Sequence, residues 1–494
     1  MNALSYTVYK RSTDARRKND IKFVLSVVCE VPENTRIRES SNVSVFDEER
    51  YPQLPKISPK PENMHPVVCG FGPAGMFSAL LLARHGLCPV VLEQGDDIDT
   101  RALKTEKYLS GKELDTRSNI QFGEGGAGAF SDGKLITRIN DPRTSFVLKT
   151  LHEHGAPEDV MTLAHPHIGT DLLRKVVKSI RLEIERLGGK VLFRHKLEDL
   201  KETSSGCEIT LSGGEKIHAP ALFLATGHSS HATYRMLLSR GMEITAKDFS
   251  VGVRIEHLQS EVERSLYGRE REENDILPKA EYSVSYRENG RGCYSFCMCP
   301  GGLVMASASD EDSIVTNGMS YHARDRKNSN SALAVSVLRH DFGDDPIRAI
   351  EFQRDIERRA FAVSGDFRAP AQTVGDFLND KRSVSFNGIE PTYPHGIVGC
   401  ELRYVLPDFV SNMLKNGLRY FEKMHSFFSE KSAPMTGVET RTSSPVRIAR
   451  GESFVATGFK AVYPCGEGAG WAGGITSAAV DGLKCAESYI KSIT

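Results

Sequence analysis

The sequence predicts an α/β protein: a Rossmann-like dinucleotide-binding domain with an inserted α+β substrate domain and a small N-terminal α+β module. Three observations support this prediction. A glycine fingerprint stands between a short apolar strand and an apolar helix, a second strand ends in an acid, and a glycine-rich strand and helix close the chain. The expected boundaries are 1–62 for the module and its linker, 63–245 for the first part of the nucleotide domain, 246–438 for the insertion and 439–494 for the returning part.

The N-terminal module is predicted from two strands rich in aromatic and β-branched residues, at 4–9 and 21–28, with a proline-rich linker at 52–66. The connection between the strands, residues 10–22, holds six Lys and Arg against two Asp. A solvated face is the simplest explanation of this excess. The alternative is a phosphate-rich partner such as RNA, but sparse aromatic residues argue against nucleic acid.

The fingerprint G-x-G-x-x-G consists of Gly70, Gly72 and Gly75. The first glycine permits a tight turn, the second lets a pyrophosphate approach the backbone, and the third lets the helix pack close to the strand. Pro73 suits the first helical turn, where its missing N–H is not needed. We expect the pyrophosphate at this helix N-terminus. The residues expected to contact it are Gly70, Gly72, Pro73, Ala74 and Gly75.

The second strand, residues 89–92, is followed directly by Glu93, 18 residues after Gly75. A carboxylate at this place can accept hydrogen bonds from a ribose diol. A tight turn without a ligand would account for the glycines alone. It would not account for strand, helix, second strand and acid in register, so the segment predicts a dinucleotide site.

A second glycine-rich segment, residues 121–135, has four glycines between positions 123 and 128. Its backbone can wrap closely around a ligand, and its two phenylalanines are costly to expose, which favours a cofactor-contacting loop over a mobile surface loop. Further on, a strand at 221–224 ends in a small-residue turn that can lie against an adenosine. From these two segments we expect cofactor contacts from Gly125, Gly126, Ala127, Thr226 and Gly227.

Residues 246–430 contain the pattern of a largely antiparallel sheet with long helices at 347–362 and 408–428, expected to form the substrate domain. The chain then returns through a short strand, an acid and a glycine cluster before its last helix. This makes a second helix terminus able to bind an anion or a carbonyl. The residues expected at the cofactor here are Gly466, Glu467, Gly473, Gly474 and Ile475.

Composition excludes several classes of protein. The formal net charge is −1, so no global field attracts nucleic acid or a membrane surface. No apolar run reaches membrane-spanning length, and the N-terminus lacks a signal-peptide core. The 10 cysteines are scattered through strand-like segments, as in a reduced cytosolic protein. We therefore expect a cytoplasmic protein without membrane association; nothing in the sequence indicates its oligomeric state.

The order of these segments resembles the glutathione-reductase-like FAD fold. A closer match is carried by residues 121–135, 296–302, 317–320, 439–445 and 465–475. These strings resemble the uncharacterised FAD-dependent dehydrogenases, also called NAD(FAD)-utilising dehydrogenases, and the resemblance covers nearly the whole chain from about residue 4. It implies FAD as the bound cofactor, Glu467 on its ribityl chain, and the Gly473–Gly474 terminus at the flavin N1–C2=O edge. It implies no particular substrate.

No second fingerprint stands between a strand and a helix, so no dedicated NAD(P)H domain is expected. Hydride could come from an organic substrate itself or from NAD(P)H that visits the flavin transiently. The expected function is an FAD-dependent dehydrogenase acting on a small organic molecule held between the inserted sheet and the flavin. The alternatives are a flavin monooxygenase that uses external NAD(P)H and an RNA-associated flavoprotein.

The candidate catalytic residues are Cys297, Cys299 and His395. Three interpretations are open for the two cysteines and nearby Cys293. They are core residues of a strand, reactive thiols that face the flavin, or zinc ligands for which no fourth ligand is visible nearby. In a regular strand, Cys297 and Cys299 would share a face without being well placed for a mutual disulfide. His395 lies in a Pro/Gly turn, and two roles are open for it: it carries a proton near the flavin, or it only stabilises the turn. No metal site is predicted.

Three arginines precede the returning strand: Arg441, Arg447 and Arg450. A guanidinium group offers a planar fork for a carboxylate or phosphate, so one of them is a candidate for holding an acidic substrate. A surface or interdomain salt bridge is the equally good alternative for each.

Overall fold

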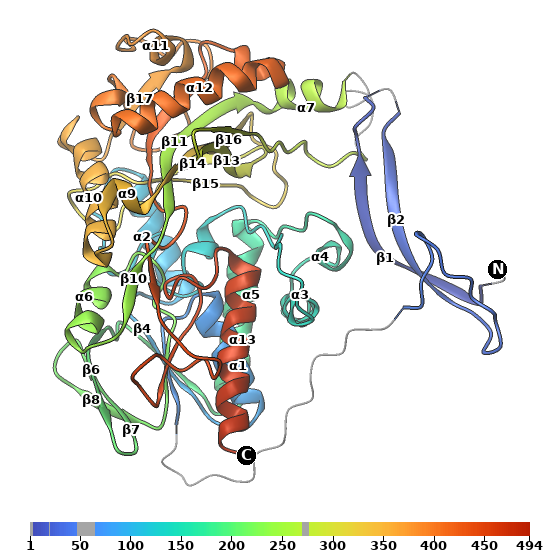
Figure 1. The fold of residues 1–494 in the computed structure, drawn as a ribbon, viewed down its shortest axis with the longest axis vertical. Helices are drawn as coiled ribbons and strands as arrows, with labels where there is room; N and C mark the ends of the chain where they lie inside the picture. Colours follow the sequence, from blue (N-terminus) through green and yellow to red (C-terminus); the bar gives the residue numbers. More distant parts are fainter. Residues whose placement is uncertain (1–2, 19, 47–64, 269–275) are drawn as a thin grey trace.

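The computed structural model describes residues 3–18, 20–46, 65–268 and 276–494 (Figure 1). Two large domains lie one above the other in this view, and an N-terminal hairpin stands beside them. The proline-rich linker predicted over 52–66 falls almost entirely outside the described residues.

The nucleotide domain is built on a five-stranded sheet with the order β21-β9-β3-β4-β5, in which every neighbouring pair is parallel. Three of these strands are buried along their whole length, as expected when layers cover both faces of a parallel sheet. The strands are β3 (Val67–Cys69), β4 (Val90–Glu93), β5 (Lys190–Phe193), β9 (Leu222–Leu224) and β21 (Val462–Pro464).

Helices cover one face of this sheet and a small antiparallel sheet covers the other. Helix α1 is almost wholly buried, because α5 and α13 flank it (Figure 1). The expected Rossmann-like fold is confirmed. The elements are α1 (Pro73–Arg84), α2 (Ile98–Leu109), η1 (Ala127–Phe130), α3 (Arg143–Glu153), α4 (Asp159–Thr162), α5 (Thr170–Arg186), β6 (Leu197–Thr203), β7 (Gly206–Leu211), β8 (Lys216–Ala219), α6 (His231–Ser239) and α13 (Ile475–Ser492).

The inserted domain contains a seven-stranded sheet with the order β12-β13-β16-β11-β19-β17-β18. Its neighbours are antiparallel except for β17 and β18. Two short strands, β10 (Ile244–Ala246) and β20 (Val446–Ile448), pair where the chain leaves and re-enters the nucleotide domain. The sheet strands are β11 (Phe249–Leu258), β12 (Ser285–Glu288), β13 (Arg291–Cys299), β16 (Asn328–Val337), β17 (Ala369–Thr373), β18 (Ile397–Gly399) and β19 (Pro434–Glu439).

Helix α12 packs against β12, β13 and β16, and α10 packs against β17 and β19, so both contribute to one apolar core with the sheet. A separate hairpin, β14 and β15, packs against apolar residues of the nucleotide domain. The elements are α7 (Gln259–Tyr267), β14 (Leu303–Ala306), β15 (Thr316–Met319), α9 (Arg339–Phe342), α10 (Pro346–Ala362), α11 (Val374–Leu378), η2 (Leu402–Tyr404), α12 (Asp408–Met424) and η3 (Ser426–Ser429).

In the N-terminal module, the two predicted strands form an antiparallel hairpin of β1 (Ser5–Asp14) and β2 (Lys22–Glu30), and described residues 3–18 and 20–46 contain no helix (Figure 1). The basic segment 10–22 lies partly in these strands and partly in the short connection between them. One strand is fastened to the body, where the Ala164 N–H donates to the Arg11 carbonyl over 2.8 Å.

Candidate cofactor site and catalytic cavity

The three fingerprint glycines meet different surroundings. A Cβ on Gly70, whose φ is +96°, would lie 2.3 Å from the Ala225 oxygen, and one on Gly75 would lie 1.9 Å from the Gly70 oxygen. On Gly72, the nearest atom would be the Gly126 Cα at 3.7 Å. Two of the glycines therefore permit close packing of backbone on backbone. Gly72 leaves open space beside the start of α1.

Two helix N-termini face one cavity. Gly72 is the N-cap of α1 and Gly474 that of α13, and no described side chain caps either helix. Neither first turn contains an acid. Unpaired N–H groups and the positive ends of two helix dipoles are therefore available to an anionic or carbonyl ligand.

Glu93 is buried and its carboxylate is held by the backbone. It accepts N–H bonds from Phe71 at 2.9 Å, Gly95 at 2.9 Å and Gly123 at 3.1 Å. A carboxylate has about four acceptor sites, so one remains for a further donor in the cavity that Glu93 lines. Glu93 thus ties the fingerprint turn to the glycine loop.

Arg101 shapes the glycine loop from behind, and the sequence analysis missed it. Its fully buried guanidinium donates to five carbonyl oxygens of the loop over 2.6–3.2 Å. Burial lowers its pKa to about 9, which still leaves it charged at neutral pH. A single arginine in an amphipathic helix gives no sequence signal of such a role. The five acceptors belong to Asn119, Ile120, Gly123, Glu124 and Gly126.

A cavity of about 680 Å³ runs from the fingerprint turn to the inserted sheet. This volume is typical of a site for a small molecule or cofactor. Most of the residues expected at a cofactor lie in its wall, together with one candidate catalytic cysteine. They are Gly70, Gly72, Pro73, Ala74, Glu93, Gly126, Ala127, Thr226, Gly227, Glu467, Gly473, Gly474, Ile475 and Cys297.

Three of the expected cofactor residues do not line the cavity: Gly75, Gly125 and Gly466. They lie behind its wall, where chain segments pack closely together. A Cβ on Gly125 would meet the Ala129 Cβ at 3.0 Å and the Val177 side chain at 3.2 Å. A Cβ on Gly466 would lie 2.6 Å from the Ala74 Cβ, between the returning turn and α1. These glycines allow close approach of backbone segments, and the segments they support carry the contacts.

The structure does not bring His395 to the cavity. Its ring lies among aromatic side chains, with centroid distances of 4.6 Å to Tyr108, 5.7 Å to Phe367 and 6.1 Å to Tyr393. Burial lowers its pKa, which disfavours the charged form. This geometry corresponds to the structural interpretation of His395 and gives it no contact with the cavity wall.

Of the three candidate arginines, Arg441 reaches the cavity. Its guanidinium makes a bidentate pair with Glu357, at 2.7 and 2.8 Å, and its Nη1 has no partner among the described residues although it is buried. Arg447 stacks on Trp471, with the guanidinium carbon 4.7 Å from the ring centroid. Arg450 pairs with Asp481.

His228, a residue that the sequence did not single out, also lines this cavity. Its Nδ1 lies 3.4 Å from a Glu467 oxygen. Its Nε2 is buried and meets no hydrogen-bond partner within the described part of the chain. Two residues of the cavity wall therefore each carry a buried polar atom without a partner among the described residues, this Nε2 and the Nη1 of Arg441.

Cys297 lies in the wall where β13 is irregular. The pairing of β13 with β16 shifts register between Phe296 and Cys299, and Cys297 has a φ of +45°. Cys299 is fully buried behind it and donates from its thiol to the Cys297 carbonyl over 3.4 Å. The structure therefore separates the two candidate cysteines into one at the cavity and one beneath it.

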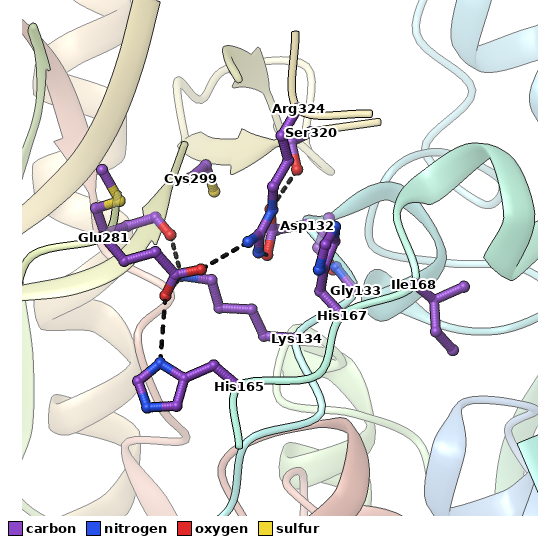
Figure 2. Close-up of polar contacts among 12 residues, drawn as sticks. Asp132, Gly133, Lys134, His165, His167, Ile168, Glu281, Cys299, Ser320 and Arg324 are labelled. Carbon is purple, nitrogen blue, oxygen red and sulfur yellow. Dashed lines mark hydrogen bonds and ion pairs between the residues drawn. The ribbon is translucent and has the colours of Figure 1, made fainter. Parts of the chain in front are cut away.

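A buried charged network borders the cavity next to these cysteines (Figure 2). Arg324 pairs with Asp132 at 2.5 Å and with Glu281 at 2.7 Å. Lys134 pairs with Glu281 at 3.3 Å and donates to the Met298 carbonyl, between the two cysteines. The pairs hold the pKa of Asp132 and Glu281 below and that of Lys134 above the ordinary value, against the effect of burial.

The strand order, the glycine turn and this cavity define a dinucleotide-binding protein of the Rossmann-like class. Residues 248–442 match the family described as FAD-dependent protein, C-terminal domain-like. The chain is 47% identical over 490 residues to an uncharacterized protein of Clostridium beijerinckii, covering 98% of this chain and 92% of the relative. It therefore belongs to the same family as that protein.

Solved structures give more distant likenesses. A glycine oxidase from Geobacillus kaustophilus is 10% identical with a TM-score of 0.36, covering 86% of this chain and 93% of that one. CtdE in complex with FAD is 12% identical with a TM-score of 0.34, covering 85% and 83%.

Membrane-spanning helices and metal-ligand clusters are both absent from the part of the chain that the structure describes. None of the helices in this part combines the length and apolarity needed to cross a membrane. This part also contains no group of three or more His, Cys, Asp or Glu that could hold a metal ion. The interpretation of the β13 cysteines as zinc ligands therefore gains no support.

Proposed function

We propose that this protein is an FAD-dependent oxidoreductase, a dehydrogenase that transfers a hydride between a small organic substrate and the flavin. The observation that supports this most is the single cavity in which the fingerprint turn, two uncapped helix N-termini and the inserted sheet meet. Any NAD(P)H would act as a transient visitor to the same cavity, since the chain has one fingerprint.

The cavity wall fits FAD along its length. Gly72, Gly227 and Gly473 leave room where side chains would otherwise fill the space. We place the pyrophosphate at the α1 terminus, the adenosine ribose at Glu93 and the adenosine near Gly227. The flavin end then lies at the α13 terminus, with Glu467 beside the ribityl chain. When bound, FAD supplies the two-electron chemistry, and the protein supplies position and electrostatics.

We place the substrate between the flavin end and the inserted sheet, with Arg441 as its recognition residue. Glu357 fixes the guanidinium by two bonds, Arg441 lines the cavity, and its buried Nη1 has no partner among the described residues. A carboxylate or carbonyl oxygen would satisfy this buried donor, which favours a substrate with an acidic group. The free Nε2 of His228 offers a second polar contact.

The first test identifies the cofactor. Purified protein should release FAD on denaturation, measured by mass spectrometry, because the turn and Glu93 provide for a pyrophosphate and a second ribose. Release of FMN, or of no flavin, would contradict the proposal.

The second test is an anaerobic screen of small organic acids, hydroxy acids and amino acids, with flavin bleaching as the readout. Arg441→Lys should raise the KM of a bleaching substrate, because lysine cannot hold Glu357 and the substrate together. Arg447→Lys, outside the cavity, is the matched control and should leave KM unchanged. Tight saturation by NADPH, toward the lower end of the usual KM range of about 1 μM to 1 mM, would contradict a site for one nucleotide. Oxygen uptake stimulated by NADPH would favour the monooxygenase alternative instead.

A further inference from the structure

We propose that Cys297 and Cys299 form a dithiol–disulfide couple that exchanges two electrons with the bound flavin. The inference rests on the proposed function, because it requires FAD in the cavity. It gives the protein a second redox group, beside the flavin, made from its own side chains.

The first argument is the shape of β13. In a regular strand, residues two apart are separated by about 6.6 Å, and their side chains stand parallel on one face. Here the register shifts between Phe296 and Cys299, and Cys297 adopts a left-handed φ of +45°. The sequence argument against a disulfide assumed a regular strand, and this segment is not a regular strand.

The second argument is that the two cysteines contact each other while only one faces the cavity. The Cys299 thiol donates to the Cys297 carbonyl over 3.4 Å, which places the Cys299 sulfur directly behind Cys297. The Arg254 guanidinium donates to the same carbonyl over 3.0 Å and thereby holds the bend. Cys297 is half-buried in the cavity wall, so it can meet the flavin or a substrate, with Cys299 behind it as its partner.

The electrostatics give the two sulfurs different protonation states. The hydrogen bond from Cys299 is the largest cause that lowers the pKa of Cys297 to about 6; Arg254 and Lys134 add to it, while burial and Asp132 oppose it. The same bond, with burial, raises the pKa of Cys299 well above its ordinary value. At neutral pH the pair is therefore one thiolate and one thiol, the state from which a dithiol is oxidised.

The electron and proton balance closes with the flavin alone. The Cys297 thiolate and the Cys299 thiol lose two electrons as an S–S bond forms between them. The S–H bond of Cys299 breaks, and its single proton completes the two-electron, one-proton reduction of oxidised FAD. The reverse step consumes the same electrons and proton, so no other oxidant or reductant is needed.

Charged groups from three segments of the chain lie beside the two cysteines and act on the thiolate. Lys134 lies between Glu281 and the Met298 carbonyl, and the Asp132–Arg324 pair flanks it (Figure 2). This network holds a cation beside the thiolate within a buried environment. Cys293, on the same strand, has no such surroundings: it is fully buried, away from the cavity, and burial raises its pKa to about 12. It serves as the natural control.

The experiment is an anaerobic reductive titration of the holoenzyme, combined with alkylation and peptide mass spectrometry. After mild oxidation, wild-type protein should consume about twice as much reductant per flavin as Cys297→Ala or Cys299→Ala, because each couple takes two electrons. Cys293→Ala should match the wild type. In wild-type protein, the peptide spanning Cys297 and Cys299, separated from Cys293 by cleavage after Tyr294 or Phe296, should resist alkylation when oxidised, weigh two hydrogens less, and accept two labels after reduction.

The labelling arm needs no variant, so poor folding of a cysteine variant leaves it intact. Equal reductant consumption by wild type and variants, or full alkylation of both cysteines in the oxidised state, would overturn the couple. If FAD is present and a substrate bleaches it while the thiols stay unchanged, the couple alone fails. If no FAD is released, the proposed function fails with it.

Discussion

The two halves of the cavity are built by different means. The nucleotide half consists mainly of backbone, with glycine turns, uncapped helix termini and an acid held by three N–H groups. The inserted half presents side chains, and its charged wall residues Glu439 and Arg441 are held by buried partners behind the wall, Arg254 and Glu357. A ligand common to a whole family needs only the first kind of wall. The second kind can change with the substrate while the fold is kept.

The first way to test this contrast should give the largest effect. Arg254 and Glu439 are both buried, so Arg254→Met leaves a carboxylate without its bidentate partner. We expect a loss of about 3–5 kcal/mol in the free energy of unfolding, measured by denaturant titration.

Two variants sharpen this prediction. Adding Glu439→Leu should recover much of the loss, because a matched apolar pair often replaces a buried ion pair at little cost. Arg240→Met removes the half-exposed pair with Asp199 and should cost about 1 kcal/mol or less. Equal losses at the buried and surface sites would show that the inserted half does not depend on its buried pairs.

A second prediction tests the exception in the nucleotide half, where one side chain supports the glycine loop. Arg101→Met removes a charged donor from five carbonyl oxygens. We expect about 2–3 kcal/mol lower stability and weaker FAD binding, measured by unfolding and by flavin fluorescence on titration. Arg101→Lys keeps the charge with fewer donors, so its stability and FAD affinity should lie between those of the wild type and Arg101→Met. Unchanged FAD affinity in Arg101→Met would show that the loop keeps its shape without this side chain.

The sequence could predict the backbone half because its determinants are contiguous. Three glycines within six positions and an acid after the next strand define the turn and its surroundings. By contrast, Arg254 and Glu439 are 185 residues apart, and Arg101 meets its acceptors only through tertiary packing. Nothing local distinguishes such residues from surface charges. For the same reason His395 was a reasonable candidate that the fold placed among aromatic rings.

The N-terminal module shows the reach of a local signal. Aromatic and β-branched residues correctly predicted its two strands, but they could not show which side chains of the hairpin would be covered. Tyr6 is 71% exposed and Val24 is 51% exposed in the hairpin, so no core covers these side chains in the described structure. Strand propensity is local, whereas a small α+β domain requires a buried face.

The third prediction separates cofactor binding from folding. Gly72→Val places a branched side chain in the open space beside α1, and we expect FAD affinity to fall about tenfold or more, equivalent to about 1.4 kcal/mol. The apoprotein should fold, because a Cβ there meets no atom closer than 3.7 Å. Gly75→Val is the contrasting variant: its Cβ would lie 1.9 Å from the Gly70 oxygen, so folding itself should fail. Full flavin occupancy in Gly72→Val would refute our placement of the pyrophosphate.

The last prediction concerns pH and changes reactivity while leaving the fold intact. Because its pKa is lowered from 9.0 to about 6, Cys297 should be mostly thiolate at neutral pH. Its alkylation rate in the native holoenzyme should rise as the pH passes about 6 and then level off, whereas an ordinary thiol would continue to gain reactivity toward pH 9.

Lys134→Met removes one of the neighbouring cations, so the midpoint of the alkylation profile should move to higher pH, while Arg324 still holds Glu281. Cys293, with its raised pKa, should stay unlabelled in the same digest. A midpoint near 9 in wild-type protein, or no shift in Lys134→Met, would mean that the charged network, which joins the glycine-rich segment of the nucleotide domain to the insertion, does not act on the thiol.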